Sequence, residues 1–146
     1  MKRYLLGGAL VAALALGACG ASPATPGAPG AGQAAPAAVN LAQLPETIDV
    51  ATANALRDNP DVVLIDVREQ EEYDAGHIPG VKLIPLGQLQ QRLAEIPTDK
   101  TVVVTCRSGN RSGQGAVLLR QSGFSRVHNM DGGILAWEAA GLPVER

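Results

Sequence analysis

The stretch VVVTCRSGNRSGQG, residues 102–115, joins a run of β-branched residues to a loop rich in arginine, serine and glycine. The run before Cys106 predicts a buried strand, and the residues from about Ser112 onward predict a helix. Cys106 is therefore expected at the carboxyl end of a strand, where the reactive loops of parallel sheets are found. This position makes Cys106, one of two cysteines in the chain, the first candidate for a functional group.

The sequence on both sides of this stretch alternates between strand and helix patterns. Strands are expected within residues 46–50, 61–67, 80–86, 100–106 and 125–130, and helices within residues 51–57, 68–76, 86–96, 111–123 and 132–141. The helix at 86–96 is predicted from Leu86, Leu89, Leu93 and Ile96, which recur at helical spacing before Pro97. Such alternation predicts an α/β fold with helices on both faces of a parallel sheet.

The loop after Cys106 has the composition of an anion-binding cradle. Ser108, Gly109 and Asn110 allow the backbone to curl, so that successive N–H groups can converge on one centre. The following helix adds the positive end of its dipole, and the two arginines of the loop add full charges. All of these stabilise a thiolate, which is the nucleophilic form of cysteine. An inert buried cysteine is the common alternative, but the residues around Cys106 favour a nucleophile.

Three segments resemble the rhodanese family of sulfurtransferases. The loop CRSGNR, residues 106–111, resembles its active-site loop, and DVREQEEYDAGHIPGVKLIPL, residues 66–86, resembles its N-terminal signature. The segment NMDGGILAWEAAGLPV, residues 129–144, resembles its C-terminal signature. The resemblance covers nearly all of residues 48–144 and implies a three-layer α/β/α fold around a central parallel five-stranded sheet.

The resemblance also implies a mechanism. Cys106 would take the outer sulfur of a small anionic donor such as thiosulfate, become a persulfide and pass that sulfur to cyanide or a thiol, without a cofactor. The side chains of the two arginines would attract the donor, or Arg111 would brace the loop instead. The persulfide would be held by the backbone of Arg107, Ser108, Gly109, Asn110 and Arg111.

The other polar residues have structural interpretations. Asp66 and Arg68 would support the neighbouring loop, with Arg68 pairing with Glu72 at helical spacing. His77 would tie down a turn instead of serving as a base for Cys106, and His128 would be a satisfied side chain in a strand. The acidic residues between 69 and 74 would form a solvated helix face. With two cysteines at opposite ends of the chain and two histidines, no metal site is expected.

Two other functions fit parts of this pattern. A phosphatase or arsenate reductase uses a cysteine, a nest of amides and an arginine, but phosphatase signatures place five residues between the cysteine and the arginine. Four residues lie between Cys106 and Arg111, and the smaller ring suits a sulfur atom. A persulfide carrier or binding module is the second alternative, since such a domain could receive its sulfur from another protein.

The N-terminal part of the chain has a different composition. Residues 1–18 predict a secretory signal, with Lys2 and Arg3 before a short apolar run. Residues 16–19 resemble the lipobox of bacterial lipoproteins, in which Cys19 would be lipidated; ordinary signal cleavage is the alternative. Residues 19–38 are rich in alanine, glycine and proline and predict a disordered tether, which leaves residues 39–146 as the domain. We expect an exported, membrane-anchored protein that faces the periplasm or the cell exterior.

The charge of the chain limits its partners. The formal charge is −2 for 146 residues, and loss of residues 1–18 makes it −4 because Lys2 and Arg3 are removed. The domain has no basic run, so a nucleic acid is not an expected partner. The oligomeric state is not predicted.

Overall fold

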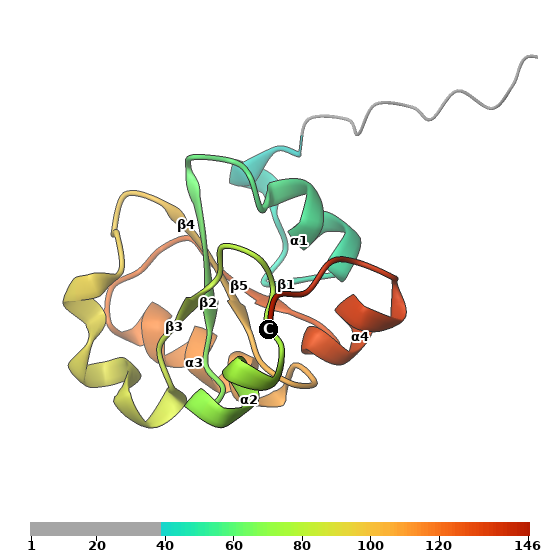
Figure 1. Cartoon of the computed structure of the whole chain (residues 1–146). Helices are drawn as coiled ribbons and strands as arrows, with labels where there is room; N and C mark the ends of the chain where they lie inside the picture. Colours follow the sequence, from blue (N-terminus) through green and yellow to red (C-terminus); the bar gives the residue numbers. More distant parts are fainter. Residues whose placement is uncertain (1–38) are drawn as a thin grey trace, which may run out of the picture. The chain divides into compact units, whose positions relative to one another are not determined.

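The computed structural model describes residues 39–146, so the predicted signal, Cys19 and the tether lie outside the described residues. The described part contains one five-stranded parallel sheet in the order β1-β5-β4-β2-β3 (Figure 1). The predicted α/β class is thereby confirmed. The strands are β1 (Thr47–Ile48), β2 (Val62–Asp66), β3 (Lys82–Leu83), β4 (Thr101–Thr105) and β5 (Val127–Met130).

The middle of the sheet is formed by β4, which pairs with β2 on one side and β5 on the other. Every residue of β4 is buried, as expected for a parallel strand that is covered on both faces. The register aligns Asp66 of β2 with Thr105 of β4. Arg68 and Cys106 follow within two residues of this aligned pair, so both emerge at the same edge of the sheet.

Helices cover both faces of the sheet (Figure 1). On β4, Val103 belongs to one hydrophobic core and Val104 to the other, as the alternation of side chains along a strand requires. The fully buried Trp137 packs in the core of Val103, and its indole N–H donates to the carbonyl of Pro143 at 2.9 Å. The helices are α1 (Val50–Leu56), α2 (Gln70–Ala75), α3 (Asn110–Gln121) and α4 (Gly133–Ala139), and none of them within residues 39–146 has the length and hydropathy to cross a membrane.

The helix predicted at residues 86–96 is wrong. Two 3₁₀ helices, η2 (Leu86–Gln91) and η3 (Leu93–Glu95), occupy this segment, and a third, η1 (Leu41–Gln43), precedes β1. Leu86 and Leu89 are three residues apart, as are Leu93 and Ile96, and three is the period of a 3₁₀ helix. The apolar spacing was therefore compatible with two short 3₁₀ helices as well as with one α-helix.

The start of α4 lies against the backbone of the Cys106 loop. The amide of Ile134 donates to the carbonyl of Cys106 at 2.8 Å, and the amide of Leu135 donates to the carbonyl of Arg107 at 3.2 Å. A Cβ on Gly133 would lie 2.3 Å from the Cys106 carbonyl oxygen. Only glycine therefore allows α4 to approach the loop this closely, and Gly133 also has a positive φ of 56°.

We predict that Gly133→Ala lowers the free energy of unfolding by about 3 kcal/mol or more, because left-handed strain and overpacking of backbone act together. Gly123→Ala is the matched control: its φ is 97°, and a Cβ there would meet nothing within 4 Å. The control should lose only about 1–2 kcal/mol from the φ strain. Urea unfolding of both variants measures the difference, and equal losses would contradict the close approach at Gly133.

Candidate functional site

Cys106 directly follows β4 and has a side chain that is almost fully buried, with 1% of the residue exposed. The donors at its sulfur include the amide of Gly109, at 3.1 Å from Sγ, and the hydroxyl of Ser112, at 3.3 Å. Gly109 has a φ of 96°, and this left-handed turn directs its amide back toward the sulfur. The loop therefore curls at Gly109, but the amides of Arg107, Asn110 and Arg111, which were also predicted to hold the sulfur, form no hydrogen bond with Sγ in the described residues.

The surroundings of Cys106 favour its thiolate. Burial raises the pKa of the thiol, but hydrogen bonds from the Ser112 hydroxyl and from the amides of Ser112, Ser108 and Gly109 lower it further than burial raises it. The net result is a pKa below the usual value for cysteine. These donors are neutral dipoles, so they stabilise the anion without forming an ion pair with it.

Ser112 is the residue of the site that the sequence did not reveal. Its hydroxyl is fully buried and lies 3.1 Å from the carbonyl of Gly109 as well as close to the sulfur of Cys106. The helix was expected to begin near Ser112, whereas α3 begins at Asn110. Ser112 is therefore in the first turn of α3, and its side chain faces back into the loop.

Arg111 braces the loop, one of the two roles considered for it. Its guanidinium forms a bidentate ion pair with Glu72 of α2, and both N–O distances are 2.7 Å. This pairing, together with an amide contact from Glu69, outweighs burial and lowers the pKa of Glu72 to about 2. The carboxylate of Glu72 is therefore paired with Arg111, and the prediction that the Glu72 side chain belongs to a solvated acidic helix face is wrong.

Arg68 is buried and supports α2. The predicted ion pair between Arg68 and the carboxylate of Glu72 is wrong, because Arg68 pairs with Asp66 instead. Its guanidinium forms an ion pair with the carboxylate of Asp66, with 2.7 Å between Nη2 and Oδ2. The Nε–H of Arg68 donates to the same carboxylate oxygen. Its remaining N–H groups donate to the carbonyls of Glu72 at 3.0 Å and Gly76 at 2.8 Å. The side chain of Arg68 therefore ties the end of β2 to the last turn of α2.

Arg107 is the exposed arginine of the loop, and within residues 39–146 it takes part in no ion pair. It borders a groove of about 240 Å³ between α2 and α4. We call this the α2–α4 groove; its walls are formed by Arg68, Glu72, Ala75, Gly76, Arg107, Ile134, Leu135 and Glu138.

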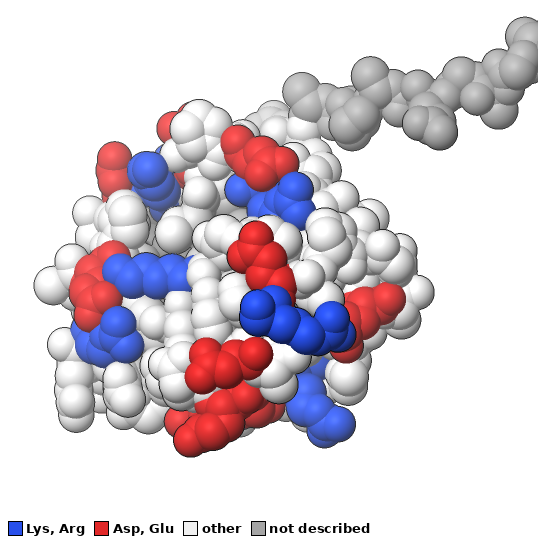
Figure 2. Space-filling model, viewed as in Figure 1, with Lys and Arg blue, Asp and Glu red and all other residues white. Residues whose placement is uncertain are grey.

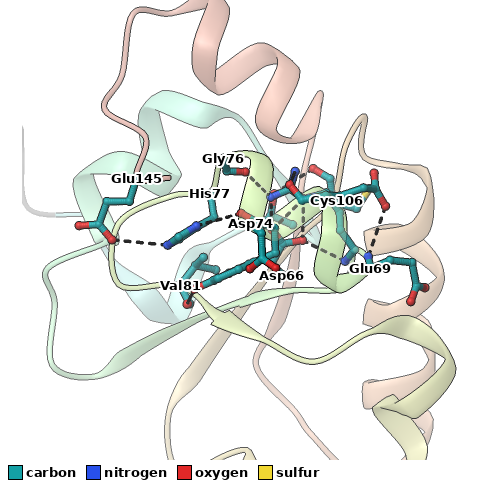
Figure 3. Close-up of polar contacts among 12 residues, drawn as sticks. Asp66, Glu69, Asp74, Gly76, His77, Val81, Cys106 and Glu145 are labelled. Carbon is teal, nitrogen blue, oxygen red and sulfur yellow. Dashed lines mark hydrogen bonds and ion pairs between the residues drawn. The ribbon is translucent and has the colours of Figure 1, made fainter.

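The two histidines have no contact with Cys106. The ring of His77 points toward Glu145 and away from Cys106 (Figure 3), and it stacks on Tyr73 with 3.8 Å between ring centroids. We expected both ring nitrogens of His128 to form hydrogen bonds, but only one of them does. Nδ1 lies 2.6 Å from the carbonyl oxygen of Pro45, while Nε2 is buried without a partner in the described part of the chain. A histidine base for the thiol is thus not part of this site.

The chain resembles several known proteins. The family model for the "Rhodanese-like domain" matches residues 49–140. A protein named sulfurtransferase from Allochromatium vinosum is 45% identical over 61% of this chain and 83% of its own length. A thiosulfate sulfurtransferase, GlpE, from Pseudoalteromonas translucida is 38% identical over 64% of this chain and 89% of its own length.

Solved structures show the same architecture. A rhodanese-related protein from Thermoplasma volcanium superimposes with a TM-score of 0.61 at 32% identity, over 68% of this chain and 97% of that protein. Several further relatives are longer, and the chain spans between 40% and 59% of their length.

We predict that Ser112→Ala raises the pKa of Cys106, because the thiolate loses a hydrogen bond from a buried hydroxyl. Its alkylation by iodoacetamide near neutral pH should slow by about tenfold, the effect of about 1.4 kcal/mol. The measurement is the alkylation rate across a pH series. Ser122→Ala is the control, since that hydroxyl binds the carbonyl of Leu118 at the far end of α3. An unchanged pH profile in Ser112→Ala would show that the hydroxyl does not stabilise the thiolate.

Proposed function

The chain belongs to the rhodanese-like family, and from this premise we propose that it is a sulfurtransferase that works through a persulfide on Cys106. The observation that carries the proposal is the convergence of the Gly109 amide and the Ser112 hydroxyl on Sγ. These donors stabilise an anion on sulfur, which is what a nucleophilic cysteine requires. The relatives named sulfurtransferase support the same class of reaction.

In the first half-reaction the Cys106 thiolate attacks the outer sulfur of thiosulfate. The new bond joins Sγ to that sulfur, the S–S bond of thiosulfate breaks, and its electron pair leaves with sulfite. The products are a Cys106 persulfide anion and a sulfite dianion, so charge is conserved. The exposed guanidinium of Arg107 attracts the dianionic donor.

In the second half-reaction an acceptor anion, cyanide or a thiolate, attacks the outer sulfur of the persulfide. The persulfide S–S bond breaks, and its electron pair returns to Sγ as the thiolate of Cys106. The product is thiocyanate or a new persulfide. Sulfite leaves before the acceptor enters, so the same loop serves both half-reactions in turn.

Phosphoryl chemistry fits this site less well than sulfur transfer. A phosphatase needs its loop arginine to bind the tetrahedral oxyanion, but the guanidinium of Arg111 is held by both carboxylate oxygens of Glu72. The persulfide carrier stays the second candidate, because a Cys106 persulfide is common to both functions and a relative from Bacillus subtilis is named a putative sulfur carrier protein.

We predict that incubation with thiosulfate adds one sulfur atom to Cys106, seen by mass spectrometry of the full chain and lost after addition of cyanide. Cys106→Ser should abolish both the mass gain and the turnover, since loss of a covalent nucleophile costs orders of magnitude. Circular dichroism of the variant checks that the fold is intact. Turnover in Cys106→Ser above about a tenth of wild type would remove Cys106 from its role.

For the segment outside the described residues we propose lipidation of Cys19 after cleavage behind residue 18, which would anchor the domain to a membrane through the tether of residues 19–38. The support is the sequence pattern LGAC at residues 16–19. We predict that wild type partitions into a detergent phase and carries acyl mass, while Cys19→Ser does not. If the wild-type protein stays in the aqueous phase and carries no acyl mass, Cys19 is not lipidated and ordinary signal cleavage is the better interpretation.

A further inference from the structure

The α2–α4 groove is larger than the proposed donor needs. Its volume of about 240 Å³ is just below the range of about 300–1,000 Å³ typical of sites for drug-sized ligands, whereas thiosulfate has five heavy atoms. The groove therefore has space for an organic molecule of modest size.

The groove is held next to the reacting loop by two links. Leu135 on one wall of the groove donates its amide to the carbonyl of Arg107, and the neighbouring amide of Ile134 donates to the carbonyl of Cys106. On the other wall, Glu72 holds Arg111 at the far end of the loop. The groove therefore lies beside the loop that follows Cys106, and Arg107 of that loop lines it.

The walls of the groove combine apolar surface with one available cation and one available anion. Leu135 is 46% exposed, one of two large apolar side chains in the described part that are exposed to this degree. Arg107 and Glu138 form no ion pair within residues 39–146. The other charged groups, Arg68 and Glu72, are already paired.

We propose that the α2–α4 groove binds the sulfur acceptor, and that this acceptor is a small zwitterionic thiol of the cysteine type. Its carboxylate pairs with Arg107, its ammonium pairs with Glu138, and its carbon chain packs on Leu135. A simple anion would leave Glu138 without a partner, and a neutral thiol would leave both charges unpaired. The assignment rests on the proposed sulfur transfer and names the acceptor for it.

The transfer balances without a further reactant. The thiolate of the bound acceptor attacks the outer sulfur of the Cys106 persulfide, the S–S bond to Sγ breaks, and its electron pair restores the Cys106 thiolate. The zwitterionic thiol leaves as its persulfide anion. Arg107 is free for the acceptor at this point, because sulfite has already left.

The first test is the kinetics of the full chain with thiosulfate as donor and three acceptors: L-cysteine, 2-mercaptoethanol and cyanide. Leu135→Ser should raise the KM for cysteine about fivefold by loss of apolar contact. Glu138→Gln should raise it about threefold, in line with the modest strength of exposed ion pairs. The KM for cyanide should not change in either variant, and the KM for 2-mercaptoethanol should not change in Glu138→Gln.

Two matched controls lie outside the groove. Val117→Ser removes an apolar side chain on α3 that is 48% exposed, nearly the same as Leu135 at 46%. Glu71→Gln removes an exposed carboxylate on α2 that does not line the groove. Both should leave the KM for cysteine unchanged; an equal rise in the controls, or a matching rise for cyanide, overturns the assignment.

The second test does not depend on sulfur chemistry. S-methylcysteine is zwitterionic but cannot accept sulfur, and its binding to the full chain should shift the NMR signals of the Ala75, Leu135 and Glu138 amides. These shifts should weaken in Glu138→Gln, and their absence in wild type overturns the groove as a binding site. If S-methylcysteine binds there while wild type moves no sulfur to any acceptor, the proposed sulfur transfer fails and the binding site stands.

Discussion

The buried ion pair between Asp66 and Arg68 is the interaction on which the rest of the site depends. The Asp66 carboxylate is at the end of β2, and the guanidinium that it holds also donates to two carbonyls at the end of α2. Since both side chains are almost completely buried, removing either partner would leave an uncompensated charge in the interior. The pair therefore fixes α2 relative to the sheet, and through α2 it fixes Glu72 at the position where Arg111 can reach it.

The loop of Cys106 is held from two sides by elements that are distant in the sequence. On one side α2 binds Arg111 through Glu72, and on the other side α4 binds the carbonyl of Cys106 through the amide of Ile134. Between these two attachments the amides of the loop have little freedom to turn away from the sulfur. Donors that are fixed before the reaction stabilise a developing charge without reorganisation during it, which explains why a loop that contains glycine can serve as a rigid cradle.

The strands and the position of Cys106 at the end of β4 could be predicted because local sequence determines them. The buried run before Cys106 has the composition of a central parallel strand, and the residues after it have the composition of a nest. The partners of the charged side chains could not be predicted in the same way: Glu72 is four residues from Arg68, yet it pairs with Arg111 across the space between α2 and α3. The contribution of Ser112 was also hidden, because it depends on α3 beginning at Asn110 and not two residues later.

The distribution of charge in the site suits a reaction in two halves. Neutral donors contact the sulfur of Cys106 and one loop guanidinium is neutralised by Glu72, so within residues 39–146 Arg107 is the loop arginine that forms no ion pair. Figure 2 shows acidic side chains gathered over α2, the helix that contributes Glu72 to the groove. A site with two free arginines would bind a dianion more tightly, but it would also retain sulfite after the first half-reaction. In the proposed sulfur transfer, one free cation between an acidic helix and Glu138 would attract the donor, release the sulfite and then become available to the acceptor, which is what alternation of two ligands on one cysteine requires.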